Sequence, residues 1–426
     1  MTKERFDVVI AGGGASGMTA AIFAARAGCS VLVLEQKEKL CKKIYATGNG
    51  KCNFTNKDWK ASYFRGSNSR LAEPVLRSFG LSDTLAFFQE IGIYPKERNG
   101  YYYPNSEQAA SVAEALCREA ERLSVRCITG KKVLRAGKTE EGLFFAEAEG
   151  KCYSGKSMVL ATGGKASPVH GSDGSGYPLA EAFGHTVLLP LPAIVQLKAE
   201  GRFFKTLAGV RTEGTVRLHI ETKGGTECYT EQGELLFAPY GISGIPVMQL
   251  SRYAAVALAE KRAVQAELDL FPAAEEAELF EELMRRFLRM RDNTAEEAMC
   301  GLCNHKLNYV VLTLCGIPPE KAAGTLTRED AARIAGKLKH FIIKITDTNG
   351  FEQAQACVGG VPLTELTEQM ESRLVRGLFF TGELTDIDGT CGGYNLQWAW
   401  SSGAAAGREI GGRYASDSAV KIKASS

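Results

Sequence analysis

The chain has 426 residues, with 51 Lys and Arg against 49 Asp and Glu and a formal net charge of +2. Near neutrality without a run of five or six like charges leaves no electrostatic footprint for nucleic acid or an anionic membrane, and we expect neither as a partner. Apolar residues make up 45% and charged residues 23%, which excludes a disordered or fibrous chain. A chain of this length favours two or three domains.

Cysteine usage and hydropathy indicate a cytoplasmic protein. Twelve cysteines are scattered through the chain without a signal-peptide pattern, which favours reduced thiols. No apolar run approaches the length of a membrane span. The run Cys-Gly-Leu-Cys-Asn-His at 300–305 lacks a fourth ligand for zinc, so we interpret it as the interior of a helix and expect no metal.

The first 35 residues predict a strand, a helix and a second strand in succession. Residues 6–11 form a short, β-branched apolar run, and residues 30–34 form a second one that ends before Glu35. Between them, residues 18–28 are rich in alanine, and such small residues suit a helix that lies close against a sheet. This βαβ order is that of a dinucleotide-binding unit.

The turn after the first strand reads Gly-Gly-Gly-Ala-Ser-Gly from position 12. At this spacing Gly12 makes the tight turn, Gly14 lets the backbone approach a pyrophosphate, and Gly17 allows close helix–strand packing. The helix N-terminus presents free amides to the phosphates. Glu35, 21 positions after Gly14, is placed to bind the adenosine ribose, and its charge disfavours a 2′-phosphate.

Two later segments favour FAD over NAD. Residues 158–164 read Met-Val-Leu-Ala-Thr-Gly-Gly, and alternating runs between 132 and 153 predict a small antiparallel meander before them. Residues 377–383 again give strand, glycine and acid, ending in Gly382 and Glu383. The three segments together resemble the glutathione-reductase-like FAD fold, in which the Ala-Thr-Gly turn closes the cofactor domain and the late glycine–acid pair touches the flavin ribitol.

A glycine-rich loop follows Glu383 and leads into another predicted helix. The loop contains Asp388, Gly392 and Gly393, and Asn395 is placed as the N-cap of the helix. The positive end of such a helix can face the pyrimidine side of a flavin and stabilise its reduced, anionic form.

Residues 42–56 carry the most distinctive motif, Lys-Lys-Ile-Tyr-Ala-Thr-Gly-Asn-Gly-Lys-Cys-Asn-Phe-Thr-Asn. This run resembles the motif of the BaiN-like, aminoacetone-oxidase-like family of bacterial NAD(P)/FAD-dependent oxidoreductases. Residues 163–177 and 382–397 fit the same family. Lys43 and Lys51 stand where arginine is frequent in the family, and a lysine supplies the charge without a bidentate fork.

The resemblance implies an α/β fold: a glutathione-reductase-like FAD-binding Rossmann domain with an inserted β-rich domain and an inserted helical domain. We expect the discontinuous Rossmann domain at residues 1–189 with 362–426. The β-rich, substrate-side domain is expected at 190–250 with 342–361, and the helical domain at 251–341.

FAD is the cofactor that the motifs and the resemblance imply. The expected cofactor-binding residues come from the glycine turn, the end of the second strand, the basic loop and the two later strands with the loop after them. They are Gly12, Gly14, Ala15, Ser16, Gly17, Glu35, Gln36, Lys43, Thr47, Gly48, Gly50, Lys51, Cys52, Asn53, Val133, Ala161, Thr162, Gly163, Gly382, Glu383, Asp388, Gly392, Gly393, Asn395 and Leu396.

Three side chains near the flavin-facing loops are candidates for catalysis. Tyr394 is placed to donate a proton or to pack against a substrate. Cys391 lies in the glycine-rich loop, where a redox-active thiol and a small buried thiol are both compatible with the sequence. His170 follows the Ala-Thr-Gly-Gly turn and is either a contact to flavin or substrate or a structural histidine.

The resemblance favours a reductase of a small-molecule substrate. In this hypothesis NAD(P)H is a transient electron donor, and FAD passes the hydride to an activated C=C bond of an enone such as a 3-oxo-Δ4,6 bile acid or steroid. One alternative is an FAD-dependent amine oxidase that acts on an aminoacetone-like amine and forms peroxide. A non-catalytic flavin-binding protein is the other.

Overall fold

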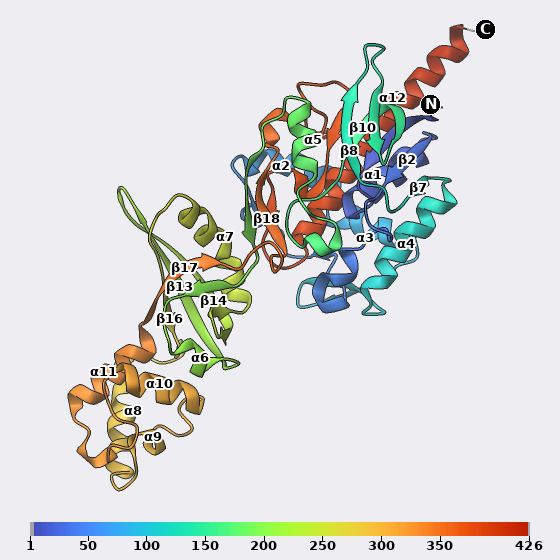
Figure 1. Ribbon diagram of the computed structural model, residues 1–426. Coiled ribbons are helices and arrows are strands. Elements are labelled where there is room, and N and C mark those ends of the chain that lie inside the picture. Colours follow the sequence, from blue (N-terminus) through green and yellow to red (C-terminus); the bar gives the residue numbers. More distant parts are fainter. Residues whose placement is uncertain (1–3, 425–426) are drawn as a thin grey trace. The chain divides into compact units, whose positions relative to one another are not determined.

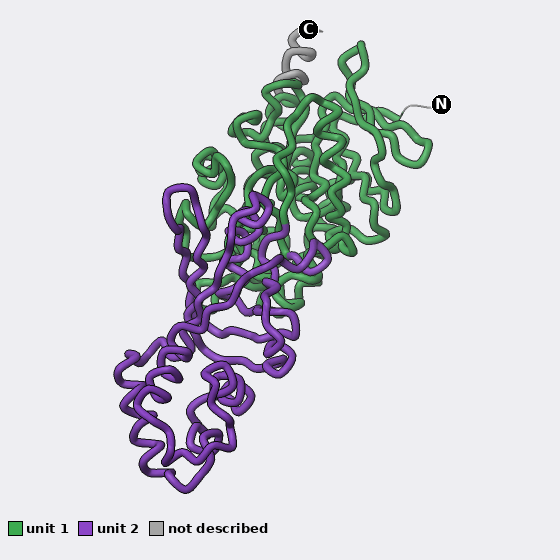
Figure 2. Tube along the Cα trace, turned by 60° about the vertical axis from the view of Figure 1, so that its left-hand side comes forward, with its two compact units in different colours: residues 1–191, 355–426 green, residues 192–354 purple. Residues whose placement is uncertain are grey.

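The computed structural model describes residues 4–424, which divide into two compact units. The first unit runs up to Leu191 and resumes at Gln355, and the second spans Pro192–Ala354 (Figure 2). The second unit contains residues 192–250 and 342–354 of the segments expected to be β-rich, together with the whole segment 251–341 expected to be helical. Residues 190–191 and 355–361, also expected in the β-rich domain, lie in the first unit.

A seven-stranded sheet forms the centre of the first unit, in the order β7-β2-β1-β10-β9-β8, with β19 beside β10. Figure 1 labels its strands β2, β7, β8 and β10. Strands β7, β2, β1, β10 and β19 pair in parallel, whereas β8, β9 and β10 form the antiparallel meander expected from the sequence. The strands are β1 (Glu4–Ala11), β2 (Val31–Leu34), β7 (Arg126–Ile128), β8 (Val133–Lys138), β9 (Phe144–Ala148), β10 (Lys151–Leu160) and β19 (Leu378–Phe380).

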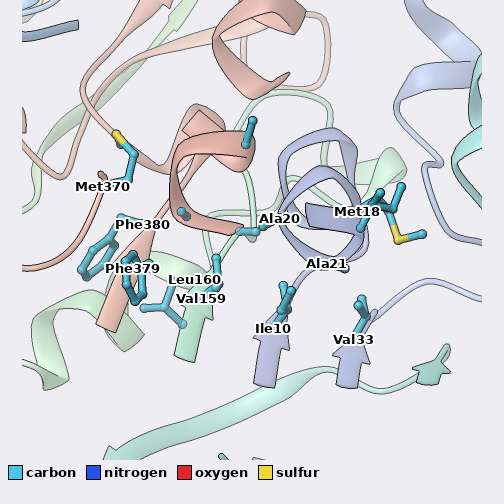
Figure 3. Packing of buried hydrophobic residues seen from close by; sticks show 14 of the residues in the cluster. Ile10, Met18, Ala20, Ala21, Val33, Val159, Leu160, Met370, Phe379 and Phe380 are labelled. Atoms are coloured by element: carbon cyan, nitrogen blue, oxygen red, sulfur yellow. The ribbon is translucent and has the colours of Figure 1, made fainter. Parts of the chain in front are cut away.

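The parallel strands are apolar because helices cover them. All four residues of β2 are buried, as is the second half of β1. Ile10, Val159 and Phe379 come from three neighbouring strands and pack in one core with Met18 of α1 (Figure 3). The helices of this unit are α1 (Ala15–Arg26), α2 (Ala72–Ser78), α3 (Leu81–Glu90), α4 (Ala109–Arg122), α5 (Gly176–Ala182) and α12 (Tyr394–Ala424).

Short strands of the first unit fix the loops that follow the Rossmann core. One small sheet has the order β3-β6-β5, and β4 pairs with β20. A further two-stranded sheet is formed by β11 and β18. The bounds are β3 (Thr55–Asn56), β4 (Phe64–Arg65), β5 (Pro95–Arg98), β6 (Tyr101–Pro104), β11 (Leu188–Ala193), β18 (Ala356–Gly360) and β20 (Asp388–Gly389).

The second unit contains a closed barrel in the order β12-β15-β14-β13-β16-β17 and six helices. Val216, Leu218 and Ile220 occupy alternate positions of β13 and are buried inside the barrel, because side chains of a strand alternate between its two faces. The strands are β12 (Leu197–Ala199), β13 (Arg211–Thr222), β14 (Gly225–Ala238), β15 (Gly241–Ser243), β16 (Val264–Asp269) and β17 (Phe341–Thr348). The helices are α6 (Phe204–Leu207), α7 (Ile245–Ala259), α8 (Glu276–Arg289), α9 (Ala295–Ala298), α10 (His305–Leu314) and α11 (Arg328–Lys339).

Two interpretations of residues 251–341 need correction. The segment is not purely helical, because it contributes strand β16, in which Val264, Ala266 and Leu268 point into the barrel core. Residues 300–305 are not a helix interior either: Cys300 and Cys303 form a β-bridge between α9 and α10. The Asn304 side chain then accepts a hydrogen bond from the Lys306 amide at 3.0 Å, so the polar residue starts a helix instead of continuing one.

The described residues contain no helix that is both long enough and apolar enough to cross a membrane. Among the same residues, no group of three or more His, Cys, Asp or Glu side chains is arranged to hold a metal ion.

Candidate cofactor and active site

An open cavity of about 1110 Å³ lies at the carboxyl ends of the parallel strands. Ala11 ends β1, Leu34 ends β2 and Ala161 follows β10, and all three residues line the cavity. Ligands of open α/β sheets bind at this edge. Part of this volume is open to solvent.

The glycine turn at the cavity floor depends on three different properties of glycine. Gly12 has φ +108, and a Cβ at this residue would lie 2.3 Å from the carbonyl oxygen of Ala161. A Cβ on Gly17 would lie 2.0 Å from the carbonyl oxygen of Gly12, so Gly17 brings α1 against the turn. A Cβ on Gly14 would meet no atom within 4 Å, because this glycine faces the cavity.

Glu35, at the end of β2, is held by the backbone of the same region. Its Oε2 accepts a hydrogen bond from the Gly13 amide at 2.7 Å, and its Oε1 accepts one from the Lys37 amide at 2.8 Å. Burial raises the pKa of this carboxyl, and the two amides act in the opposite direction. The carboxylate lines the cavity in a fixed orientation.

An ion pair connects the basic loop with the late glycine–acid turn. Lys43 Nζ lies 2.7 Å from Glu383 Oε2, and Glu383 Oε1 accepts a hydrogen bond from the Cys357 amide at 2.9 Å. The Cys357 Sγ in turn accepts a hydrogen bond from the Lys165 amide. Burial raises the pKa of Cys357 to about 12, so this thiol stays protonated and unreactive at neutral pH.

The residues present fit an FAD. The open face of Gly14 and the first-turn amides of α1 form a cradle for a pyrophosphate, and the Lys42 and Lys43 ammonium groups face the same cavity. Glu35 supplies the carboxylate that a ribose requires.

Seventeen of the expected residues surround this one cavity, although they come from both ends and the middle of the chain. They are Gly12, Gly14, Ala15, Ser16, Glu35, Gln36, Lys43, Thr47, Val133, Ala161, Thr162, Gly163, His170, Gly382, Glu383, Asn395 and Leu396. Asn395 is not the N-cap of α12, since the helix begins at Tyr394. Its side chain instead makes two hydrogen bonds to the backbone of Gly389, at 2.8 and 2.9 Å.

The other expected cofactor residues lie outside the cavity lining. Gly17 packs under the turn, and Asp388 pairs with Arg65 at 3.6 Å across β20 and β4. Gly393 packs so closely on Asn53 that a Cβ would lie 2.9 Å from its Oδ1. The remaining residues sit in the two loops beside the cavity, and they are Gly48, Gly50, Lys51, Cys52 and Gly392.

The three catalytic candidates have different surroundings. His170 lines the cavity, and burial together with the Lys42 and Lys43 charges lowers its pKa, so the imidazole is neutral at pH 7. The buried Tyr394 does not line the cavity: its hydroxyl donates to the carbonyl oxygen of Asp58 at 2.9 Å. Cys391 is half-buried in the loop that precedes α12 and is also absent from the lining.

The cavity also has lining residues that the sequence did not single out as cofactor-binding. Lys132 is one of them, and its Nζ lies 2.7 Å from Asp173 Oδ2. Gln355 precedes β18, some 340 positions from the glycine turn, and no local pattern marks it. The others are Ala11, Leu34, Cys41, Ile44, Lys131, Gly171, Ser172, Ser175 and Ala399. Lys42 of the basic loop, which the sequence indicated as a pyrophosphate contact, also lines the cavity.

Comparison with known proteins shows that the sequence of this chain matches a family. The family model described as "HI0933-like protein Rossmann domain" matches residues 6–409. The chain is 42% identical over 402 residues to the 3-dehydro-bile acid delta(4,6)-reductase of Clostridium scindens, covering 94% of this chain and 97% of the relative. It is 30% identical over 415 residues to the ribosomal RNA dihydrouridine synthase of Escherichia coli, covering 96% and 98%.

A solved structure shows the same fold. The open conformation of a flavocytochrome c3 fumarate reductase aligns with 97% of this chain and 79% of its own, with a TM-score of 0.51 at 14% sequence identity.

Proposed function

Because the chain belongs to the HI0933-like family of Rossmann-domain proteins, we propose that it is an FAD-dependent oxidoreductase that reduces a C=C bond conjugated to a carbonyl. NAD(P)H is the proposed transient electron donor, and a 3-oxo-Δ4,6 bile acid is the proposed substrate. The observation that carries the proposal is the 42% identity, over nearly the whole length of both chains, to a relative named as a bile acid delta(4,6)-reductase.

The chain's own residues bind and orient the reactants in this proposal. The amides of α1 with Lys42 and Lys43 hold the pyrophosphate, and Glu35 holds the ribose. Bound FAD supplies hydride transfer. His170, neutral and in the cavity wall, can present a ring N–H to the substrate carbonyl and so polarise the enone.

The test is anaerobic incubation of the purified holoprotein with the 3-oxo-Δ4,6 bile acid and either NADH or NADPH. We expect oxidation of one nicotinamide and a product that mass spectrometry finds heavier by two hydrogen atoms for each reduced C=C bond. Absence of this product with both donors would contradict the proposal. Omission of the nicotinamide is the matched control.

A second candidate is the same reduction at the C5=C6 bond of uracil in ribosomal RNA. The relative from Escherichia coli, named a ribosomal RNA dihydrouridine synthase, favours it. We rank this candidate second, because the identity to this relative is lower and because a net charge of +2 does not favour RNA binding. Incubation with unmodified ribosomal RNA and nucleoside mass spectrometry separates the two, because only the second candidate yields dihydrouridine.

A further inference from the structure

A second pocket, of about 570 Å³, lies on the β5–β6 hairpin of the first unit. We call it the hairpin pocket. Its walls combine cationic and aromatic side chains with one carboxylate. They are Lys51, Lys96, Arg98, Asn99, Tyr101, Tyr103 and Glu107.

The hairpin pocket adjoins the two loops that reach the FAD cavity. Tyr103 packs beside Gly48, where a Cβ would lie 3.8 Å from its ring. Tyr101 packs beside Gly392, where a Cβ would lie 3.2 Å from its ring. The first loop contains Thr47 and the second leads into Asn395, and both of these residues line the cavity. The hairpin pocket therefore lies against the two loops that carry these cavity-lining residues.

The charge of the hairpin pocket is unbalanced. Glu107 binds both Lys51, at 3.0 Å, and Lys96, at 2.7 Å, and these two ammonium groups hold the pKa of Glu107 at about 2. One carboxylate thus faces three cations. Arg98 has no ion-pair partner among the residues that the structure describes, so its guanidinium is available to an anion from outside.

The side chains of the pocket match a carboxylate on an apolar skeleton. An arginine fork binds a carboxylate through two parallel hydrogen bonds, and the lysines add charge. The faces of Tyr101 and Tyr103 offer apolar contact next to these cations. An uncharged steroid would leave Arg98 without an anionic partner and the two lysines sharing the single carboxylate of Glu107.

We propose that the hairpin pocket binds the carboxylate of the substrate and so selects acidic substrates over neutral ones. This proposal rests on the proposed function for the identity of the skeleton. Arg98 is the main contact, and Lys51 and Lys96 complete the anion site around Glu107.

The experiment compares the 3-oxo-Δ4,6 bile acid with its uncharged methyl ester. Binding of each compound to the oxidised holoprotein is measured by calorimetry in the absence of a nicotinamide. The KM of each compound is then measured in the presence of the nicotinamide. Arg98→Met removes the charge and keeps the aliphatic length. Arg118→Met, an exposed arginine on α4 outside both cavities, is the matched control.

We expect the wild-type protein and the Arg118→Met variant to prefer the acid over the ester by about tenfold or more. Arg98→Met should lose most of that preference, through a raised KM for the acid with little change in kcat or in the KM for the ester. Arg98→Lys should recover part of it, since a lysine supplies the charge without the fork. Flavin content of each variant reports that the protein is folded.

Glu107→Gln gives a test of opposite sign. Removal of the one carboxylate from the pocket should tighten binding of the acid and leave binding of the ester unchanged.

Three results would overturn the proposal: equal binding of acid and ester by the wild-type protein, an unchanged preference in Arg98→Met, or binding of neither compound. Failure of the proposed function is distinct, because it would abolish turnover of both compounds while the calorimetric preference for the acid persists.

Discussion

Gly14 and Gly17 stand three residues apart in one turn, yet an alanine at each should act on a different property. The Cβ of Gly14→Ala enters open space in the FAD cavity, so the fold is kept and the affinity for FAD falls by about tenfold or more. The Cβ of Gly17→Ala meets the Gly12 carbonyl oxygen, so the protein loses about 1–3 kcal/mol of stability.

Fluorescence titration of the apoprotein with FAD and urea unfolding measure the two effects separately. Equal loss of stability in both variants would contradict the assignment of Gly14 to the cofactor cradle.

Lys43 should stabilise the charge of Glu383, which is only 17% exposed. Lys43→Met removes one of the two hydrogen-bond donors of that carboxylate and leaves the Cys357 amide. We expect the free energy of unfolding to fall by about 1–3 kcal/mol. A double-mutant cycle with Glu383→Gln isolates the coupling, which should be at least about 0.5 kcal/mol. Additive effects of the two substitutions would show that the ion pair contributes nothing.

The Lys43–Glu383 pair also shows which features of the site could be predicted from the sequence. Gly382 and Glu383 were expected in the site from a local strand–glycine–acid pattern, and the structure places them there. Their partner is 340 positions away, and Gln355 and Cys357 have no local signal at all. Positions fixed by local backbone geometry were predictable, whereas contacts made by the tertiary fold were not.

Helix α12 packs closely on α1 at glycine positions where a side chain would not fit. A Cβ on Gly407 would lie 2.6 Å from the Ala20 carbonyl oxygen, whereas a Cβ on Gly412, in the same helix, would meet no atom within 4 Å. Helix propensity favours alanine by about 1 kcal/mol at both positions. We therefore expect Gly412→Ala to stabilise the protein and Gly407→Ala to destabilise it, because the helices must separate.

Urea unfolding followed by tryptophan fluorescence measures both variants, since the three tryptophans all lie in the first unit. Stabilisation by Gly407→Ala would contradict the close packing of α1 and α12.

Among elements, the βαβ unit was the most predictable. Its strands and helix were expected at residues 6–11, 18–28 and 30–34 and are found at Glu4–Ala11, Ala15–Arg26 and Val31–Leu34. Strand β16 was missed because the helical segments around it dominate the pattern of its region. The hairpin of β5 and β6 was also missed, since its strands are four residues each and β5 carries the exposed polar residues Lys96, Glu97 and Arg98.

At the scale of the whole first unit, His185 should make stability depend on pH. Its Nδ1 lies 2.7 Å from Glu365 Oε2, and its Nε2 lies 2.7 Å from Ser372 Oγ, which accepts hydrogen bonds from two backbone amides and donates its own proton to the ring. This arrangement suits a neutral imidazole, and burial lowers the pKa of His185 below its usual 6.5.

Below pH 6.5 the unfolded chain therefore takes up a proton that the folded chain resists, so stability should fall as the pH is lowered from 7 to 5. His185→Gln should flatten this dependence, and His305→Gln, at an exposed residue, should leave it unchanged. Urea midpoints at several pH values measure it. An equal slope in wild-type protein and His185→Gln would show that other groups cause the dependence.

The general architecture could be predicted from the sequence, but the closure of the inserted strands into a barrel could not. An α/β Rossmann fold with a β-rich insertion was expected, and the FAD-type sheet with its antiparallel meander confirms the fold class. That six strands of the insertion close into a barrel depends on the pairing of β12 with β17, whose residues are about 150 positions apart. Alternation within single strands does not encode such a pairing.

Anaerobic stopped-flow absorbance of the flavin in the purified holoprotein tests most directly whether the protein is an NAD(P)H-dependent reductase. We predict rapid bleaching by NADH or NADPH, no bleaching by aminoacetone, and reoxidation of the reduced flavin on mixing with the 3-oxo-Δ4,6 bile acid. Bleaching by aminoacetone alone would instead indicate an amine oxidase. Absence of bleaching by any of the three compounds would contradict the assignment of an NAD(P)H-dependent reductase and indicate a flavin-binding protein without this activity.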